Sequence, residues 1–348
     1  MIIDNLIVNA RHMGCSDIHI TVGMPLMFRI NGKLQKAPQQ FSDEETIEML
    51  SEMLTDKQKR ELDEGIDADF SVRTKDGNRQ RVNVFKQDKN MAATIRLLNS
   101  SIPSLDMLGL PPVLYELAEK PRGLILVTGP TGSGKSTTLA AMIDHINETR
   151  PDHIITIEDP VEYKYEEKLA LIHQREVGID VKDFASALRS ALREDPDIIL
   201  VGEMRDYETI AAALTAAETG HLVMSTLHTT GAAQTIDRIV DACPAGIQNQ
   251  IRTQLAGVLN GVITQCLIPN ARGNGRIPAT EILVGTDAVC NLIRENKCHQ
   301  IGSLMQAGSS TGMHTLNSDL SRLLQSGMIT KDAALKYTND KTELEQYL

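Results

Sequence analysis

The stretch that decides the fold is Gly129-Pro130-Thr131-Gly132-Ser133-Gly134-Lys135-Ser136. It matches the phosphate-binding loop pattern G-x-x-x-x-G-K-[ST] at every fixed position. The preceding segment, 123–128, is apolar and β-branched, as a buried strand is. After the loop, apolar residues recur at helical spacing, at Leu139, Met142, Ile143 and Ile146. The loop therefore lies between a strand and a helix, which is the context that this motif requires.

A loop of this kind binds phosphate through its backbone. Glycines allow the tight turn and direct several N–H groups inward, and the following helix adds the positive end of its dipole. We expect Lys135 to reach the β- and γ-phosphates of a nucleotide and the Ser136 hydroxyl to bind Mg²⁺. The residues expected to contact the nucleotide here are Thr131, Gly132, Ser133, Gly134, Lys135, Ser136 and Thr137.

Composition is that of an ordinary globular protein. The 348 residues are 41% hydrophobic and 23% charged, and no apolar run approaches the ~20 residues of a membrane helix. The N-terminus lacks the features of a signal peptide, so we expect a cytoplasmic protein with no direct membrane insertion. A net charge of −11 argues against a broad nucleic-acid surface, although a basic channel inside an acidic ring would escape that argument. The cysteines form no C-x-x-C pair, which disfavours a four-cysteine zinc site.

Residues 1–99 are expected to form a small α+β domain. Alternating apolar and polar residues predict a half-buried strand at 17–21, and the dipeptide Asn31-Gly32 predicts a hairpin. The remaining strands are expected at 26–30, 33–35, 69–73, 79–85 and 92–98.

A capping box at Ser42 and Glu45 predicts a helix in the same domain, continuing through Ile47, Leu50 and Leu54. Beyond the last strand, prolines at 103, 111 and 112 mark residues 100–112 as a linker. Proline disfavours regular structure and stiffens the chain, so no helix or strand is expected there.

Residues 113–348 alternate strand and helix, which predicts an α/β domain built on a mainly parallel sheet. Strands are expected at 123–128, 153–157, 197–201 and 221–226, and helices at 136–147, 183–193, 207–219 and 231–240. Further on, Ile251, Leu255, Val258 and Val262 recur at spacings of four and three, which predicts one long helix.

Hydrolysis of a nucleotide needs an acid on the metal side, and Glu203 fits that role. It follows the apolar segment 197–201 and Gly202, so it emerges at the carboxyl end of a buried strand, beside the phosphate loop. We expect Glu203 to hold Mg²⁺ through water, because Mg²⁺ keeps much of its hydration shell. The alternative is a solvated glutamate in a loop.

A second acid should activate water, and the segment Ile157-Glu158-Asp159-Pro160-Val161-Glu162 offers several. Carboxylates packed this closely repel one another unless a cation balances them, as a Mg²⁺-nucleotide would. Glu162 lies beyond the rigid proline and is favoured as the base, with Glu158 as the alternative or as a group that orients the water. A capping cluster without chemistry is the remaining interpretation.

The segment 218–229 places His221 before an apolar strand and His228 after it. Metal-binding histidines usually lie closer together, and no carboxylate or thiol pair completes a metal site. We therefore interpret the two histidines as sensors of the γ-phosphate or as hydrogen-bonding groups between subunits. The alternative is that each is a satisfied histidine of the core or an interface.

These four segments together resemble the secretion ATPase superfamily, whose corresponding motifs are called Walker A, Asp box, Walker B and His box. The similarity extends to Ser16-Asp17-Ile18-His19-Ile20 and to Asn291-Leu292-Ile293-Arg294-Glu295, so it covers nearly the whole chain. The resemblance implies a RecA-like P-loop ATPase domain preceded by a PAS-like α+β domain. It also implies that Arg81 and Arg96 reach the nucleotide's phosphates, for which a surface salt bridge is the alternative.

Within that superfamily the chain looks most similar to the pilus-retraction branch, because it lacks the extra N-terminal domain and the cysteine-rich insert of extension and secretion members. The resemblance implies a homohexamer that hydrolyses ATP to ADP with Mg²⁺ and drives type IV pilus retraction. Its partners would be an inner-membrane platform protein and a paralogous retraction ATPase, with the ring located at the cytoplasmic base of the pilus. One position departs from the family motif, since Cys290 stands where the family has arginine.

Three other functions fit parts of the sequence. A nucleic-acid translocase is possible because RecA-like rings also move DNA, and its ATPase should respond steeply to added DNA. A non-motor regulatory subunit would explain Cys290. A small-molecule kinase would share the phosphate loop but would leave residues 1–100 and the two-histidine segment without a use.

Overall fold

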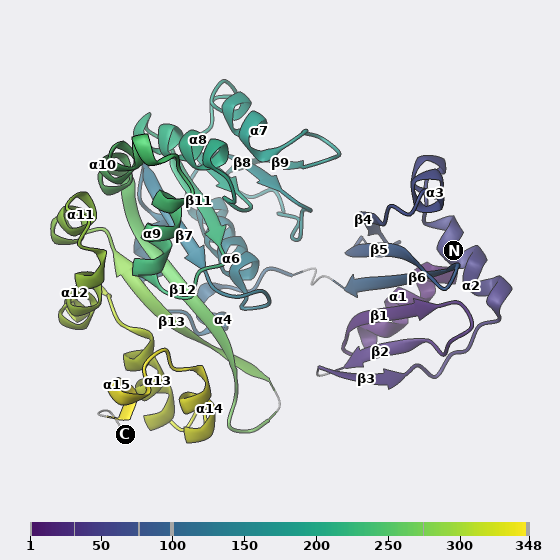
Figure 1. Cartoon of the computed structure of the whole chain (residues 1–348). Coiled ribbons are helices and arrows are strands. Elements are labelled where there is room, and N and C mark those ends of the chain that lie inside the picture. Colours follow the sequence, from purple (N-terminus) through teal and green to yellow (C-terminus); the bar gives the residue numbers. More distant parts are fainter. Residues whose placement is uncertain (1, 31, 76, 98–100, 274, 346–348) are drawn as a thin grey trace. The chain divides into compact units, whose positions relative to one another are not determined.

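The structure is a computed structural model that describes residues 2–30, 32–75, 77–97, 101–273 and 275–345. The chain divides into two compact units (Figure 1). Unit 1 comprises Met1–Ser101 and Glu162–Lys164, and unit 2 comprises Ile102–Val161 and Tyr165–Leu348.

Unit 1 is built on a six-stranded antiparallel sheet in the order β3-β2-β1-β6-β5-β4. Its elements are α1 (Ile2–His12), β1 (Cys15–Thr21), β2 (Met27–Ile30), β3 (Lys33–Lys36), α2 (Asp43–Glu52), α3 (Asp56–Asp63), β4 (Ala68–Arg73), β5 (Arg79–Gln87) and β6 (Asn90–Leu97). The predicted strands are confirmed to within a few residues. Asn31 of the predicted hairpin turn and Leu98 of the last predicted strand lie outside the described residues.

The helix predicted from the capping box begins as expected and ends early. The Ser42 hydroxyl accepts a hydrogen bond from the Glu45 N–H, and the Glu45 carboxylate accepts one from the Ser42 N–H at 2.8 Å. The prediction that the helix continues through Leu54 is wrong, because α2 ends at Glu52 and Thr55 caps a separate helix, α3. Ile47 is 42% exposed rather than part of the buried face, which Thr46, Met49 and Leu50 form instead.

The predicted linker contains a helix that the sequence did not reveal. The Ser104 hydroxyl accepts a hydrogen bond from the Met107 N–H and starts α4 (Leu105–Leu108), which ends at Gly109 in the left-handed conformation. A cap at each end lets one helical turn form between prolines 103 and 111. The prediction that 100–112 has no regular structure is therefore wrong for 105–108, and Ser100 lies outside the described residues.

Unit 2 is built on a seven-stranded sheet in the order β13-β12-β7-β11-β10-β8-β9. The strands are β7 (Gly123–Thr128), β8 (His153–Glu158), β9 (Leu171–Glu176), β10 (Ile198–Val201), β11 (Leu222–Leu227), β12 (Leu259–Pro269) and β13 (Arg276–Val284). Adjacent strands are parallel except β12 and β13, which pair antiparallel. The four predicted strands are confirmed to within one residue, and the α/β class with them.

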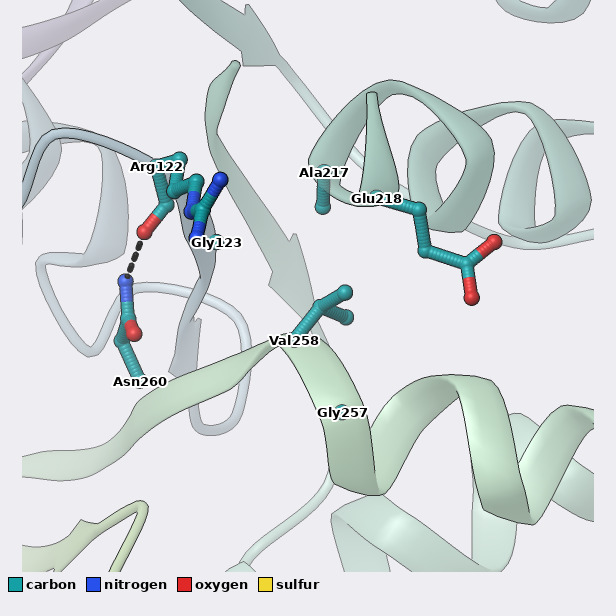
Figure 2. Close-up of a pocket in the computed structure, with 7 residues that line it drawn as sticks. All are labelled: Arg122, Gly123, Ala217, Glu218, Gly257, Val258 and Asn260. Atoms are coloured by element: carbon teal, nitrogen blue, oxygen red, sulfur yellow. Dashed lines mark hydrogen bonds between the residues drawn. The ribbon is translucent and has the colours of Figure 1, made fainter. Parts of the chain in front are cut away.

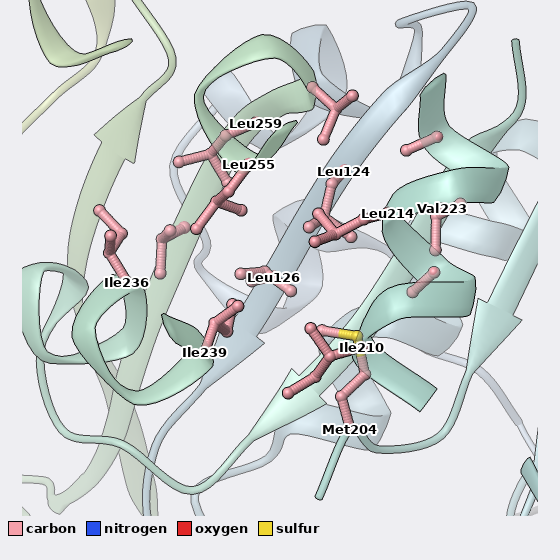
Figure 3. Packing of buried hydrophobic residues seen from close by; sticks show 14 of the residues in the cluster. Leu124, Leu126, Met204, Ile210, Leu214, Val223, Ile236, Ile239, Leu255 and Leu259 are labelled. Carbon is pink, nitrogen blue, oxygen red and sulfur yellow. The ribbon is translucent and has the colours of Figure 1, made fainter. Parts of the chain in front are cut away.

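Helices cover the sheet of unit 2. They are α5 (Val113–Ala118), α6 (Lys135–Thr149), α7 (Phe184–Ala191), α8 (Tyr207–Glu218), α9 (Ala232–Asp241), α10 (Gln248–Val258), α11 (Asp287–Arg294), α12 (Ile301–Ala307), α13 (Leu316–Gln325), α14 (Lys331–Tyr337) and α15 (Lys341–Glu345). Figure 3 shows side chains of α8, α9 and α10 packed on β7 and β11, with Leu126 of β7 fully buried among them. Among the described residues, no helix combines the length and apolarity that a membrane span needs.

The long helix predicted across 251–262 is interrupted. α10 ends at Val258, and β12 begins at Leu259. Ile251, Leu255 and Val258 are buried on the helix as expected. Val262, however, lies in the strand opposite Leu126 of β7. The pairing of β12 with β7 decides the structure at Val262, and its helical spacing from Val258 is a coincidence.

Candidate functional site

Four polar segments meet at one edge of the unit 2 sheet. β7, β11, β10 and β8 are neighbours and run parallel, with Leu227 opposite Thr128 and Val201 opposite both Ser225 and Ile157. In the same order, β7 is followed by the phosphate loop, β11 by His228 and β10, after Gly202, by Glu203. The last residue of β8 is Glu158 itself. Open parallel sheets bind ligands at the carboxyl ends of their strands. The sheet therefore brings together the segments that the sequence singled out.

The phosphate loop has the backbone that its pattern predicts. Gly129, Gly132 and Gly134 have φ values of 140°, 77° and 91°, a region that side chains rarely adopt. A Cβ on Gly129 would lie 2.2 Å from the Gln265 carbonyl oxygen, so only glycine fits there. The Lys135 Nζ donates to the carbonyl oxygens of Gly129 at 2.9 Å and Pro130 at 3.2 Å, which holds the amine across the loop.

The donors of the loop fit a phosphate group. α6 begins at Lys135 with Gly134 as its N-cap and no side-chain cap, which leaves the first-turn N–H groups uncapped by a side chain. The Ser133 hydroxyl oxygen is buried and, among the described residues, has no hydrogen-bond partner. Ser136 and Thr137 follow in the first turn of the helix, with Ser136 exposed. Phosphate oxygens supply acceptors for such groups.

The residue before Glu203, Gly202, is held by hydrogen bonds to two neighbouring strands. The Gly202 N–H donates to the Ile157 carbonyl at 2.8 Å, and the Thr226 hydroxyl donates to the Gly202 carbonyl at 2.6 Å. The Glu203 carboxylate then lies 2.7 Å from Arg205 Nε and 3.6 Å from His228 Nε2. Glu203 and His228 are therefore neighbours, and Arg205 is a partner that the sequence did not suggest.

For a metal ion, the sequence predicts Ser136 and Glu203 as ligands, and this stays a prediction. Among the described residues, no three histidines, cysteines or carboxylates are grouped so that they could hold a metal. Mg²⁺ is usually bound by one or two protein groups, with phosphates and water completing its six ligands. A serine hydroxyl and a carboxylate fit that pattern.

The acidic segment after β8 is tied to the edge strand β9. The Glu158 carboxylate accepts hydrogen bonds from the Thr156 hydroxyl at 2.7 Å and from Gln174 Nε2 at 3.3 Å. The Val161 N–H donates to the buried Glu176 carboxylate at 3.0 Å. Glu162, the favoured base, is half-buried. The contacts of Gln174 and Glu176 were not predicted, because β9 is an edge strand whose sequence lacks the apolar pattern of a buried strand.

His221 lies at the amino end of β11, whereas the phosphate loop lies at the carboxyl ends of the strands. This corrects the prediction that His221 contacts the nucleotide bound by its own chain. It precedes β11, while the phosphate loop follows β7, and a six-residue strand spans roughly 20 Å. Its Nδ1 donates to the Ala216 carbonyl at 2.9 Å, which makes it a satisfied residue at the end of α8. The prediction that it forms hydrogen bonds between subunits stays a prediction.

Arg81 and Arg96 lie opposite each other on β5 and β6 of unit 1. Arg81 makes a two-pronged ion pair with Asp69, with N–O distances of 3.2 and 2.7 Å, and Arg96 Nε lies 3.0 Å from Asp17. The salt bridges that the sequence offered as the alternative are therefore present. The side chains of Arg81 and Arg96 are 40% and 61% exposed, and their contact with a nucleotide stays a prediction.

A separate pocket opens where α8 and α10 end and β7 begins (Figure 2). It has a volume of about 430 Å³ and is lined by Arg122, Gly123, Ala217, Glu218, Gly257, Val258 and Asn260. The Asn260 amide donates to the Arg122 carbonyl at 2.8 Å across its wall. The pocket lies at the amino ends of the strands and shares no residue with the phosphate loop.

The parallel sheet, the phosphate loop and the acids at its carboxyl edge define a P-loop nucleotide-binding domain. Residues 1–345 match the family described as Type II/IV secretion system protein, and the chain belongs to that family. This confirms the resemblance to secretion ATPases.

Individual relatives and solved structures are similar over most of their length. The chain is 47% identical over 335 residues to the type IV pilus retraction ATPase PilT of Pseudomonas aeruginosa, covering 96% of this chain and 97% of that protein. It is 50% identical over 309 residues to a twitching motility protein of Neisseria gonorrhoeae, covering 88% and 83%. A crystal structure of the pilus retraction motor PilT with bound ADP superposes with a TM-score of 0.91 at 48% identity and covers 99% of both chains.

Proposed function

We propose that the chain is an ATP-hydrolysing motor that drives retraction of type IV pili. The observation that carries the proposal is the meeting of the phosphate loop, Glu203 and His228 at one sheet edge, in a family whose named relatives include a pilus retraction ATPase. ATP and ADP are the nucleotides that fit, since a solved relative of similar fold contains ADP. The bound state would require Mg²⁺.

Each predicted site residue has a distinct task in this proposal. The loop N–H groups and Lys135 neutralise the phosphates, while Ser136 and Glu203 hold Mg²⁺. Glu162 accepts a proton from the attacking water, and Glu158 orients that water because its carboxylate is already engaged by Thr156. His228, beside Glu203, senses the γ-phosphate. Arg81 and Arg96 add the positive charge that stabilises the transition state of phosphoryl transfer.

The assembly is also part of the proposal. Unit 2 would be a RecA-like domain and unit 1 a PAS-like domain, joined into a homohexamer at the cytoplasmic face of the inner membrane. The ring would act on a platform protein of the pilus, with a paralogous retraction ATPase as a further partner and no nucleic acid. Cys290, on α11, is half-buried, and its burial raises the pKa of its thiol, so the charge of the family's arginine is missing there.

The proposal is tested first by phosphate release from the purified chain. Lys135→Ala and Glu203→Ala should each lower turnover by about 10³-fold, because each removes charge stabilisation of the transition state. Lys86→Ala, which removes a surface ion pair 2.8 Å long with Asp63, is the matched control and should leave the rate unchanged. Unchanged rates in the Lys135 and Glu203 variants would end the proposal.

The direction of the motor is tested in the host. Deletion of the protein should give excess surface pili and loss of surface movement, whereas cells without pili would contradict retraction. Adding DNA to the purified protein at low salt should leave the ATPase rate unchanged. Steep stimulation would instead identify a translocase.

A further inference from the structure

A buried amide on β12 contacts the phosphate loop from behind. The Gln265 side chain is 2% exposed, its Nε2 donates to the Ser133 carbonyl at 2.7 Å, and its Oε1 accepts from the Thr138 hydroxyl at 2.8 Å. The carbonyl of Ser133 can only accept, so it fixes which end of the amide faces it. One side chain therefore joins the loop to the first turn of α6.

This contact fixes the direction of a peptide group in the loop. The carbonyl of Ser133 and the N–H of Gly134 belong to the same planar peptide and point to opposite sides. Holding the carbonyl toward Gln265 therefore aims the Gly134 N–H away from β12. In a phosphate loop, N–H groups aimed inward make the anion site. The backbone packs closely as well, since a Cβ on Gly134 would lie 3.1 Å from Gln265 Nε2.

β12 is paired with a strand on each side at this point. Thr264, next to Gln265, pairs with Thr128 at the end of β7, and the two hydroxyls are 2.9 Å apart. On the other side, Gln265 pairs with Thr280 of β13, whose N–H donates to the buried Asp319 carboxylate at 2.8 Å. The amide is therefore presented from a strand held on both sides, which a positioning group requires.

We propose that Gln265 is a positioning residue for nucleotide binding, which orients the Ser133–Gly134 peptide of the phosphate loop toward the phosphates. The inference rests on the proposed nucleotide-hydrolysing function and adds a residue to it. Gln265 acts through the loop and does not itself contact the nucleotide.

The test compares variants that keep the size of the side chain. Gln265→Met removes both hydrogen bonds, and Gln265→Glu places a carboxylate oxygen against the Ser133 carbonyl. Binding of ATP and ADP with Mg²⁺ is measured by equilibrium titration, and KM and kcat by phosphate release. Gln254→Met is the matched control, because Gln254 Nε2 donates to Glu218 at 2.8 Å on the surface of the same unit.

Gln265→Met should raise the nucleotide Kd and KM roughly tenfold, with Gln265→Glu raising them further and kcat at saturating ATP changing less. The gain in melting temperature on adding nucleotide should shrink, which a merely structural role would not cause. Thr138→Val removes only the hydroxyl that orients the amide, and it should change the same quantities by a smaller factor. If the Gln265 variants do not fold, Thr138→Val still tests the inference.

Two results overturn the inference without touching the proposed function. The first is that folded Gln265 variants bind nucleotide as tightly as the unmodified protein. The second is that the single variants Thr138→Val and Gln265→Met both change only kcat. If the unmodified protein itself binds no ATP, the proposed function fails instead.

Discussion

The two sheets of this protein place their polar groups in opposite ways. In unit 2, β7, β10 and β11 are buried along their whole length, so charged groups occur only where the strands end. In unit 1, one face of the sheet is buried through residues such as Val82 and Ile95, and the other carries charges in the middle of strands. Parallel sheets covered on both faces and antiparallel sheets open on one face differ in this way generally.

The polar groups of the two sheets also differ in how firmly they are held in place. Glu203 is fixed by a turn whose backbone bonds to two buried strands. Arg81 is fixed by an ion pair with Asp69 in which both side chains are exposed, and such pairs contribute only roughly 0–1 kcal/mol. Arg96 is also exposed, but its partner Asp17 is buried. The acids of unit 2 are thus preorganised, while Arg81 can exchange its carboxylate partner for another anion at little cost. If Arg96 turns to another anion, the buried Asp17 still has Arg29 at 3.8 Å.

The largest effect is expected in the acidic segment 158–162, which begins in unit 2 and whose last residue, Glu162, belongs to unit 1. Glu162→Gln should lower kcat by about 10²–10⁴-fold while ATP binding stays near normal, because it removes the proton acceptor but keeps the shape. Glu158→Gln, whose carboxylate already bonds Thr156, should lower kcat less. Single-turnover hydrolysis and nucleotide titration measure both. A larger loss for Glu158→Gln would transfer the role of base to that residue, and normal turnover in both would remove this segment from the chemistry.

The second effect concerns the charged face of unit 1. Arg81→Ala and Arg96→Ala should each lower kcat by roughly 10²-fold if their guanidinium groups stabilise the transition state. Arg81→Ala should change thermal stability little, because both members of its ion pair are exposed. Arg29→Ala is the control, since Arg29 lies on the same face at 3.8 Å from Asp17. Unchanged turnover in the Arg81 and Arg96 variants would leave these residues as partners in surface salt bridges.

The smallest effect compares a histidine from each unit as the pH falls. Burial is the main cause that lowers the pKa of His314 in unit 2 and of His19 in unit 1 below 6.5, and His314 is the more deeply buried. A folded-state pKa below the unfolded value gives stability that is present above pH 6.5 and lost as the pH falls toward the folded pKa. His314→Gln should therefore flatten the decline of the melting temperature below pH 6.5 more than His19→Gln does.

Groups around each histidine could reverse that order. Asp319 and Arg322 face His314, and Asp17 and Arg29 face His19. An equal slope in both variants, measured by thermal unfolding at several pH values, would show that these charges outweigh the difference in burial.

Local sequence patterns correctly predicted those elements that are determined by interactions between residues close together in the chain. The capping box at Ser42, the phosphate loop and the four apolar strands were predicted because caps, glycine turns and buried runs are encoded by near neighbours. The prediction failed at 251–262 and at α4. In the first case, pairing of β12 with a distant strand decided the structure.

The candidate site divides in the same way. Lys135, Glu203 and His228 were identified because each follows an apolar strand, and parallel strands end at a common edge. Gln265, Gln174 and Arg205 were missed, since a single polar residue in or beside a strand carries no periodic signal. His221 was assigned to the nucleotide although the sequence places it before an apolar strand. The parallel pairing of β11 with β7 shows that the length of this strand separates it from the loop.

Near-neighbour patterns were enough to predict that a phosphate-binding turn, two acidic segments and a histidine each follow a strand. The order of the strands became known from the folded chain, and with it the contact of Glu203 with His228 and the hydrogen bond from Gln265 to the loop. The physical reason is that caps and turns are settled by interactions within a few residues. Strand order and the contacts of lone polar side chains depend on burial between segments that lie far apart in the chain.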